Sequence, residues 1–156
     1  AGRSVFSGPA YPAKALSMID RIELHLPEGG PKGLGFVRGV KEVDPAEWFF
    51  TAHFHQDPVC PGSLGVESFL QLLKFAARER WPDLAESHRF ATHTGRSHRW
   101  TYRGQILPVN RRVTVEAAVT QVLDSPHPAL VAEGYLMVDG LYIYRMEEFG
   151  VQLVPV

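Results

Sequence analysis

The sequence predicts an α+β fold in which a curved antiparallel β-sheet wraps around one central, buried helix. Two features of the 156-residue chain carry this prediction. One long apolar run, residues 64–77, has the spacing of a helix, whereas apolar residues after position 113 alternate with a period of two, as in half-buried strands. Strands, one helix and then a run of strands is the order of an α+β domain. With 45% apolar residues, a chain of this length can fill one core.

The first part of the chain is expected to provide an irregular lead-in and two strands. Residues 1–13 hold two glycines and two prolines, and we expect them to be a lead-in or linker to a single domain over residues 14–156. Strands are expected over residues 17–26 and 34–43, joined by a Pro-Glu-Gly-Gly-Pro turn. The aromatic residues 48–50 then carry the chain into a loop.

The central helix is expected to start at Pro61 or Ser63 and to run to about Arg80. Its apolar residues cover more than one stripe of the helix surface, which is typical of a buried helix. A Trp-Pro pair at residues 81–82 ends it, because the residue before a proline is disfavoured in helical conformation.

The second half of the chain is expected to be a run of antiparallel strands. Residues 113–120 alternate strictly, and a turn with two prolines leads into residues 129–138. Asp-Gly at residues 139–140 is a signal for a two-residue hairpin turn. We therefore expect two further strands, over residues 141–144 and 149–154.

Composition excludes several classes of protein. The formal net charge is −1, so the chain as a whole is not a polyanion binder. Its single cysteine, Cys60, excludes an internal disulfide. No apolar run approaches the roughly 18 residues of a membrane span, and no basic-then-apolar segment opens the chain. We therefore expect a cytoplasmic protein without membrane contact. Because the chain begins at Ala1, it also fits a domain excised from a longer protein.

Charge is distributed unevenly along the chain. The stretch between Glu86 and Glu116 holds six arginines and no acidic residue. It can be a solvated basic surface on strands, or a docking face for an acidic partner or a phosphate. Nucleic acid is disfavoured, because neither an aromatic-interleaved RNA motif nor a basic helix accompanies the arginines.

The densest group of reactive residues lies in residues 53–67, His-Phe-His-Gln-Asp-Pro-Val-Cys-Pro-Gly-Ser-Leu-Gly-Val-Glu. His53 can act as a base near neutral pH. Glu67 is expected on the buried helix among apolar neighbours, where a carboxyl group can act as an acid. Gly62 is expected at the start of the helix, where unpaired backbone N–H groups can polarise a carbonyl oxygen. A base, an acid and such a donor can remove a proton beside a thioester carbonyl and expel a β-hydroxyl.

Each of these three residues also has a purely structural interpretation. His53 can be a histidine of an ordinary loop, and Glu67 can be a carboxylate favoured by the positive end of the helix dipole. Gly62 can mark a simple turn from loop to helix. The residues alone do not separate the two interpretations of Gly62.

Two other kinds of site are disfavoured in the same segment. His53, His55, Asp57 and Cys60 could be metal ligands, but their spacing matches no common zinc pattern and two prolines stiffen the segment. His55 would point away from His53 in an extended segment. Cys60 has no helix start of its own to lower its pKa, so a packed thiol is favoured over a nucleophile.

Five blocks of the sequence, in order, resemble the hot-dog-fold dehydratases of fatty-acid and polyketide synthesis. The closest likeness is to the β-hydroxydecanoyl-carrier-protein dehydratase/isomerase group and to the dehydratase domains of polyunsaturated fatty-acid synthases. Glu67 stands where the decanoyl-type enzyme has aspartate, and Cys60 stands where methionine is usual. Neither change removes a catalytic group. The blocks are residues 16–22 (Leu-Ser-Met-Ile-Asp-Arg-Ile), 44–50, 53–67, 102–108 (Tyr-Arg-Gly-Gln-Ile-Leu-Pro) and 138–144.

The resemblance implies a hot-dog fold and the dehydration of (3R)-hydroxyacyl thioesters to trans-2-enoyl thioesters. The substrate would be carried on the phosphopantetheine of an acyl carrier protein. His53 would abstract the C2 proton, Glu67 would protonate the leaving hydroxyl, and the Gly62 N–H would bind the thioester oxygen. The resemblance also implies that His53 and Glu67 of one site come from two subunits of a homodimer, or from two hot dogs in tandem. No metal and no cofactor are implied, because the elimination changes no oxidation state.

The remaining expectations concern binding and alternatives. Cys60, Val59 and Leu64 are expected to line the substrate site together with Gly62, and Arg96, Arg99 and Arg103 to dock the acidic carrier protein. Double-bond isomerisation depends on the shape of the acyl tunnel, so the motifs leave it open. A thioesterase of the same fold is one alternative function, and a non-catalytic, thioester-binding lobe of a multidomain synthase is another.

Overall fold

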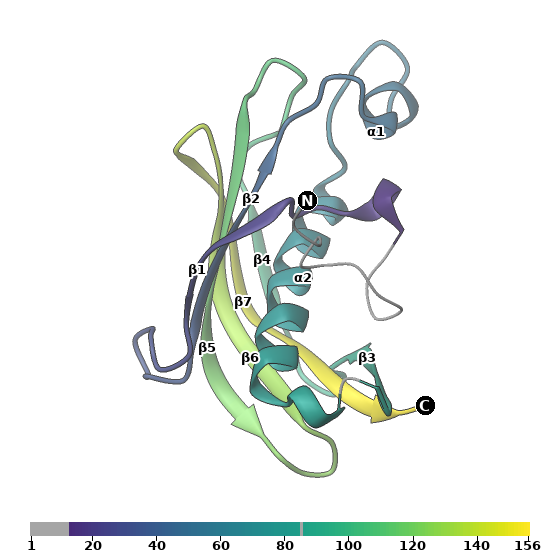
Figure 1. The fold of residues 1–156 in the computed structure, drawn as a ribbon. Coiled ribbons are helices and arrows are strands. Elements are labelled where there is room, and N and C mark those ends of the chain that lie inside the picture. The colour runs from purple at the N-terminus through teal and green to yellow at the C-terminus, as the bar shows by residue number, and fades with distance from the viewer. Residues whose placement is uncertain (1–12, 85) are drawn as a thin grey trace.

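The computed structural model describes residues 13–84 and 86–156. Figure 1 shows a strongly curved sheet with the long helix α2 (Gly62–Arg80) lying along its concave face. The α+β architecture predicted from the sequence is therefore confirmed. The strands are β1 (Arg21–Leu26), β2 (Phe36–Glu42), β3 (His88–Thr92), β4 (Arg99–Tyr102), β5 (Arg112–Leu123), β6 (Ala129–Val138) and β7 (Leu141–Pro155), and the shorter helices are η1 (Lys14–Leu16), α1 (Trp48–Ala52) and η2 (Pro82–Leu84).

The sheet has seven antiparallel strands in the order β1-β2-β5-β6-β7-β3, with β4 also paired to β7. The first part of β7 pairs with β4, and its last part pairs with β3. The two short strands therefore share one edge of the sheet. In the described chain neither of them pairs with any strand other than β7.

β7 is one strand of 15 residues, whereas the sequence predicted two shorter ones. The prediction left a break over residues 145–148, which include the acidic residues Glu147 and Glu148. In the structure Glu147 lies 3.1 Å from Arg145, and Glu148 lies 2.5 Å from Arg96. Arginine partners thus accommodate both carboxylates within the strand. A positive φ of 62° at Glu148 marks a local irregularity that the strand passes through.

Helix α2 begins at Gly62 and ends at Arg80, as expected. Nine of its residues are buried, and two of these, Ser68 and Gln71, are polar. At its C-terminus the N–H of Trp81 donates to the carbonyl of Ala77. Helix α2 is therefore buried on more than one of its faces. This burial explains why the apolar residues of its sequence extend beyond a single stripe.

The turn from β6 to β7 matches its sequence signal. Asp139 and Gly140 have φ angles of 49° and 86°. Both values are positive, as a type I′ hairpin turn requires.

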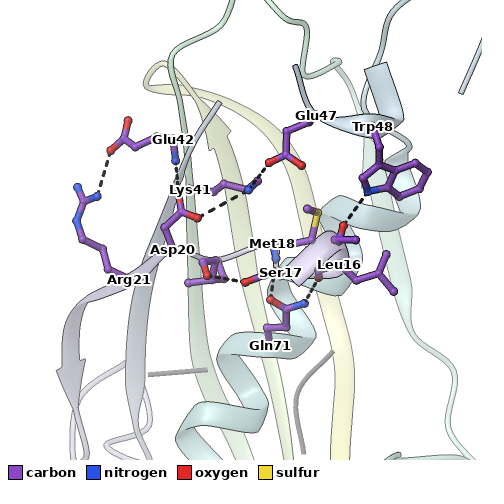
Figure 2. Close-up of polar contacts among 12 residues, drawn as sticks. Leu16, Ser17, Met18, Asp20, Arg21, Lys41, Glu42, Glu47, Trp48 and Gln71 are labelled. Atoms are coloured by element: carbon purple, nitrogen blue, oxygen red, sulfur yellow. Dashed lines mark hydrogen bonds and ion pairs between the residues drawn. The ribbon is translucent and has the colours of Figure 1, made fainter. Parts of the chain in front are cut away.

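Two short segments differ from the prediction. β1 starts at Arg21 rather than at residue 17, because residues 16–18 bind to helix α2 instead of to the sheet. Figure 2 shows that the Gln71 side chain accepts a hydrogen bond from the N–H of Met18 and donates one to the carbonyl of Leu16. The aromatic residues 48–50 belong to the short helix α1, where Phe49 and Phe50 are buried.

Two further expectations concern the N-terminal lead-in and membrane-spanning helices. The lead-in over residues 1–13 falls, apart from residue 13, outside the described residues. None of the described helices is long and apolar enough to cross a membrane.

Candidate active site

His53 lies at the C-terminal end of α1 and is held by backbone atoms. Its N–H donates to the carbonyl of Phe49 at 3.0 Å, and its ring Nδ1 lies 3.1 Å from the carbonyl oxygen of Val59. Because a carbonyl oxygen only accepts, Nδ1 must carry the proton. The neutral ring then presents Nε2 with a free lone pair. The half-buried imidazole is therefore oriented as a base.

The loop after His53 is anchored at its far end. Residues 54–58 are exposed, whereas Val59 and Cys60 are buried. The Cys60 N–H donates to the carbonyl of Ile106 at 2.9 Å. Ile106 belongs to residues 102–108, one of the blocks that carry the family resemblance. That block thus holds the loop against the sheet, a role that the sequence did not predict.

Aromatic rings cover the first turn of α2. A Cβ atom on Gly62 would lie 2.8 Å from the Trp100 ring, and one on Gly65 would lie 2.2 Å from the Tyr144 ring. Only glycine allows such close approaches. The first N–H groups of the helix have no acceptor within the helix, and Pro61 provides no side-chain cap. Gly62 therefore combines available donors with an aromatic wall.

Trp100, Tyr102 and Tyr144 form one ring cluster, with centroids 5.0–5.6 Å apart. Trp100 and Tyr102 are 39% and 42% exposed, whereas Tyr144 is buried. The Tyr144 hydroxyl has no hydrogen-bond partner among the described residues. Burial, with smaller contributions from Tyr102 and Cys60, raises the pKa of Tyr144 above its ordinary value, so the hydroxyl keeps its proton. This cluster was not predicted from the sequence. The available signal was the spacing of Trp100 and Tyr102, which are two residues apart and therefore lie on the same face of a strand.

The surroundings of Glu67 differ from the expectation. Glu67 was expected among apolar neighbours, but it also has two polar ones. Its Oε1 accepts hydrogen bonds from Gln71 Nε2 at 3.0 Å and from Lys74 Nζ at 3.1 Å. Both donors follow Glu67 on the same helix, at i+4 and i+7, so they lie on the same face. Helical spacing was the signal that could have predicted them.

His53 and Glu67 do not meet within one chain. No hydrogen bond or ion pair joins the two side chains in residues 13–84 and 86–156. His53 contacts backbone atoms near the end of α1, and Glu67 contacts side chains further along α2. Within one chain, the imidazole of His53 and the carboxylate of Glu67 therefore have separate partners.

A small cavity lies beside the first turns of α2. Its volume of about 20 Å³ is enough for roughly one water molecule, so an acyl chain needs neighbouring side chains to move. Cys60 and Leu64 line this cavity, but Val59 and Gly62 do not. Other parts of its wall come from Met18, Lys41, Glu47, Phe49, Phe50 and Ser68.

Cys60 is a buried thiol. Burial, and to a lesser extent the nearby carboxylate of Glu47, raises its pKa from 9.0 to about 12. The thiol therefore stays protonated at neutral pH and is a poor nucleophile. In addition, no group of three His, Cys, Asp or Glu side chains is placed to hold a metal ion within the described part of the chain.

The three candidate docking arginines differ in their surroundings. Arg96 donates to Glu148 at 2.5 Å and to Gln121 at 3.0 Å. Arg99 is largely exposed and lies 3.8 Å from Glu147. Arg103 is exposed and forms no ion pair with any residue that the structure describes. Arg99 and Arg103 thus face solvent, while the half-buried Arg96 is paired with side chains of this chain.

The sequence matches a known family along most of its length. Residues 11–147 match the model of the FabA-like domain family. The chain is 40% identical to part of the polyunsaturated fatty acid synthase of Thraustochytrium sp., over 86% of this chain and 9% of that polypeptide. The chain thus spans less than a tenth of this relative.

Two solved structures are similar in shape. The dehydratase heterocomplex ApeI:P from Xenorhabdus doucetiae has a TM-score of 0.63 at 11% identity, covering 92% of this chain and 86% of that one. A thioesterase mutant from Pseudomonas aeruginosa has a TM-score of 0.56 at 13% identity, covering 78% and 76%. At such identities they show the fold alone, and this is the expected hot-dog fold.

Proposed function

Because this chain belongs to the FabA-like domain family, we propose that it dehydrates (3R)-hydroxyacyl thioesters to trans-2-enoyl thioesters. The observation that carries the proposal is the orientation of His53. Its Nδ1 donates to the Val59 carbonyl, which leaves Nε2 free to accept a proton. A relative from a polyunsaturated fatty acid synthase supports a role in fatty-acid synthesis, with a substrate carried by the phosphopantetheine of an acyl carrier protein.

The reaction is an elimination in which the protein only moves protons. His53 Nε2 takes the proton from C2, the electron pair forms the C2–C3 double bond, and the C3–O bond breaks. Glu67 gives a proton to the departing hydroxyl, which leaves as water. The Gly62 N–H binds the thioester oxygen while negative charge develops on it. The substrate undergoes no net oxidation or reduction, so we expect no cofactor and no metal.

The site is proposed to form between two copies of the chain or between two hot dogs in tandem. Within one chain His53 and Glu67 have separate partners. The strand β4 lies at an edge of the sheet and carries the partly exposed rings of Trp100 and Tyr102 beside Gly62. A second copy on this edge would cover these rings, and we propose that the partner subunit's Glu67 completes the site of His53. Arg99 and Arg103 remain our candidates for docking the acidic carrier protein.

A thioesterase is the second candidate function, because a thioesterase shares the fold. The two activities leave different products from one substrate. A dehydratase leaves the thioester intact and removes one water from the acyl group, whereas a thioesterase releases a free acid and a thiol. A thioester-binding lobe without catalysis would leave the substrate unchanged.

The test is mass spectrometry of a 3-hydroxyacyl thioester after incubation with the purified protein. We expect loss of one water with the thioester intact, and we expect His53→Ala to abolish it. His55→Ala is the matched control, because His55 is an exposed histidine two residues away. Turnover retained in folded His53→Ala would overturn the assignment. Separating 2-enoyl from 3-enoyl products in the same samples tests for isomerisation.

A further inference from the structure

The carboxylate of Glu67 is held asymmetrically. Oε1 accepts two hydrogen bonds, one from the Gln71 amide and one from the Lys74 ammonium. Oε2 has no hydrogen bond or ion pair with any described residue. One oxygen is therefore fixed by the protein, and the other is left for a further ligand.

We propose that Lys74 is a positioning residue that orients Glu67 as the acid of the elimination. Lys74 holds Oε1, so that Oε2 faces the leaving hydroxyl, and its charge stabilises the carboxylate that forms as Glu67 gives up its proton. The inference rests on the proposed function, in which Glu67 is that acid.

The local structure gives Lys74 this influence. The side chains of Lys74 and Glu67 are only 18% and 28% exposed, so solvent screens their attraction less than that of a surface pair. Gln71 is buried and is fixed by the backbone of Leu16 and Met18 (Figure 2). The segment that packs on Gln71 thus contributes a carbonyl and an N–H but no charge. Of the two donors to Glu67, Lys74 alone carries a charge.

The ammonium favours the carboxylate that forms in the proton transfer, so it lowers the barrier of that step. Removing the charge should therefore lower kcat and leave KM little changed. A lysine that only stabilised the helix would lower the free energy of unfolding without this selective loss of kcat.

The experiment compares kcat and KM of the wild type, Lys74→Met, Lys74→Arg and Arg78→Met at one pH. Arg78→Met removes one positive charge from an exposed position of the same helix and serves as the matched control. For Lys74→Met we expect kcat to fall about tenfold. KM should change little. Lys74→Arg should restore kcat, and Arg78→Met should match the wild type.

A second readout does not depend on turnover. In protein labelled with ¹³C at glutamate carboxyls, the Glu67 carboxyl resonance should shift at a fixed pH in Lys74→Met and return in Lys74→Arg. Circular dichroism confirms folding of each variant. A wild type that turns over, with unchanged kcat and an unmoved Glu67 resonance in Lys74→Met, would overturn the inference. A wild type without turnover would overturn the proposed function and the catalytic role of Lys74, while a shifted resonance would still establish the contact.

Discussion

The two sides of the candidate site are built in different ways. Backbone atoms hold His53, through the carbonyls of Phe49 and Val59, whereas side chains hold Glu67, through Gln71 and Lys74. A backbone acceptor is present whatever side chain its residue carries, as long as the loop keeps its path. A side-chain donor disappears with one substitution. The hydrogen bonds of His53 therefore do not depend on which side chains surround it, although the centroid of its ring also lies 4.1 Å from that of the Phe54 ring. The hydrogen bonds of Glu67 depend on the side chains of its neighbours.

The largest expected effect tests whether the two sides of one site come from different chains. His53→Ala and Glu67→Gln should each be inactive alone. After mixing under conditions that exchange subunits, about half of the dimers are hybrids, and each hybrid has one intact site, so we expect about a quarter of the wild-type activity. The measurement is turnover of the mixture against each variant alone. No recovery after proven exchange would place both groups in one chain.

The next effect tests the side built from side chains. Gln71→Leu removes the partners of the buried Met18 N–H and Leu16 carbonyl and also one donor to Glu67. We expect the free energy of unfolding to fall by about 2–4 kcal/mol, and kcat to fall as well. Chemical denaturation and turnover measure the two effects.

Gln121→Leu is the matched control, because Gln121 is half-buried in the central strand β5 and its side chain accepts a hydrogen bond from Arg96 rather than contacting Glu67. It should change the free energy of unfolding by less than about 1 kcal/mol. Equal decreases in the free energy of unfolding in both variants would mean that the hydrogen bonds of Gln71 stabilise the fold no more than those of Gln121.

The same division explains what the sequence could predict. The start of α2 at Gly62 and the Asp139-Gly140 turn follow from local residues, and both were predicted correctly. The partners of Glu67 were also within reach, since Gln71 and Lys74 follow it at helical spacing. The prediction considered only the apolar neighbours of Glu67 and was therefore wrong about its environment.

Contacts between distant segments were beyond the sequence. Trp100 reaches Gly62 because β4 pairs with the first part of β7, a pairing that no local pattern encodes. The sequence predicts a strand from residue 17, yet the Met18 N–H donates to the side chain of Gln71, a buried glutamine 53 residues later in the chain. Apolar alternation predicts a strand but does not say which neighbour takes its hydrogen bonds.

The smallest effect tests the side built from backbone. Val59→Ala removes two methyl groups from a buried side chain but keeps the carbonyl that orients His53. We expect the free energy of unfolding to fall by about 1–2 kcal/mol, while kcat stays within about threefold of the wild type. Denaturation and turnover of the same preparation measure both. Gln71→Leu should lose stability and kcat together, so Val59→Ala should separate the two. A loss of kcat of about a hundredfold in folded Val59→Ala would show that side-chain packing also sets the His53 ring, and the contrast between the two sides would fail.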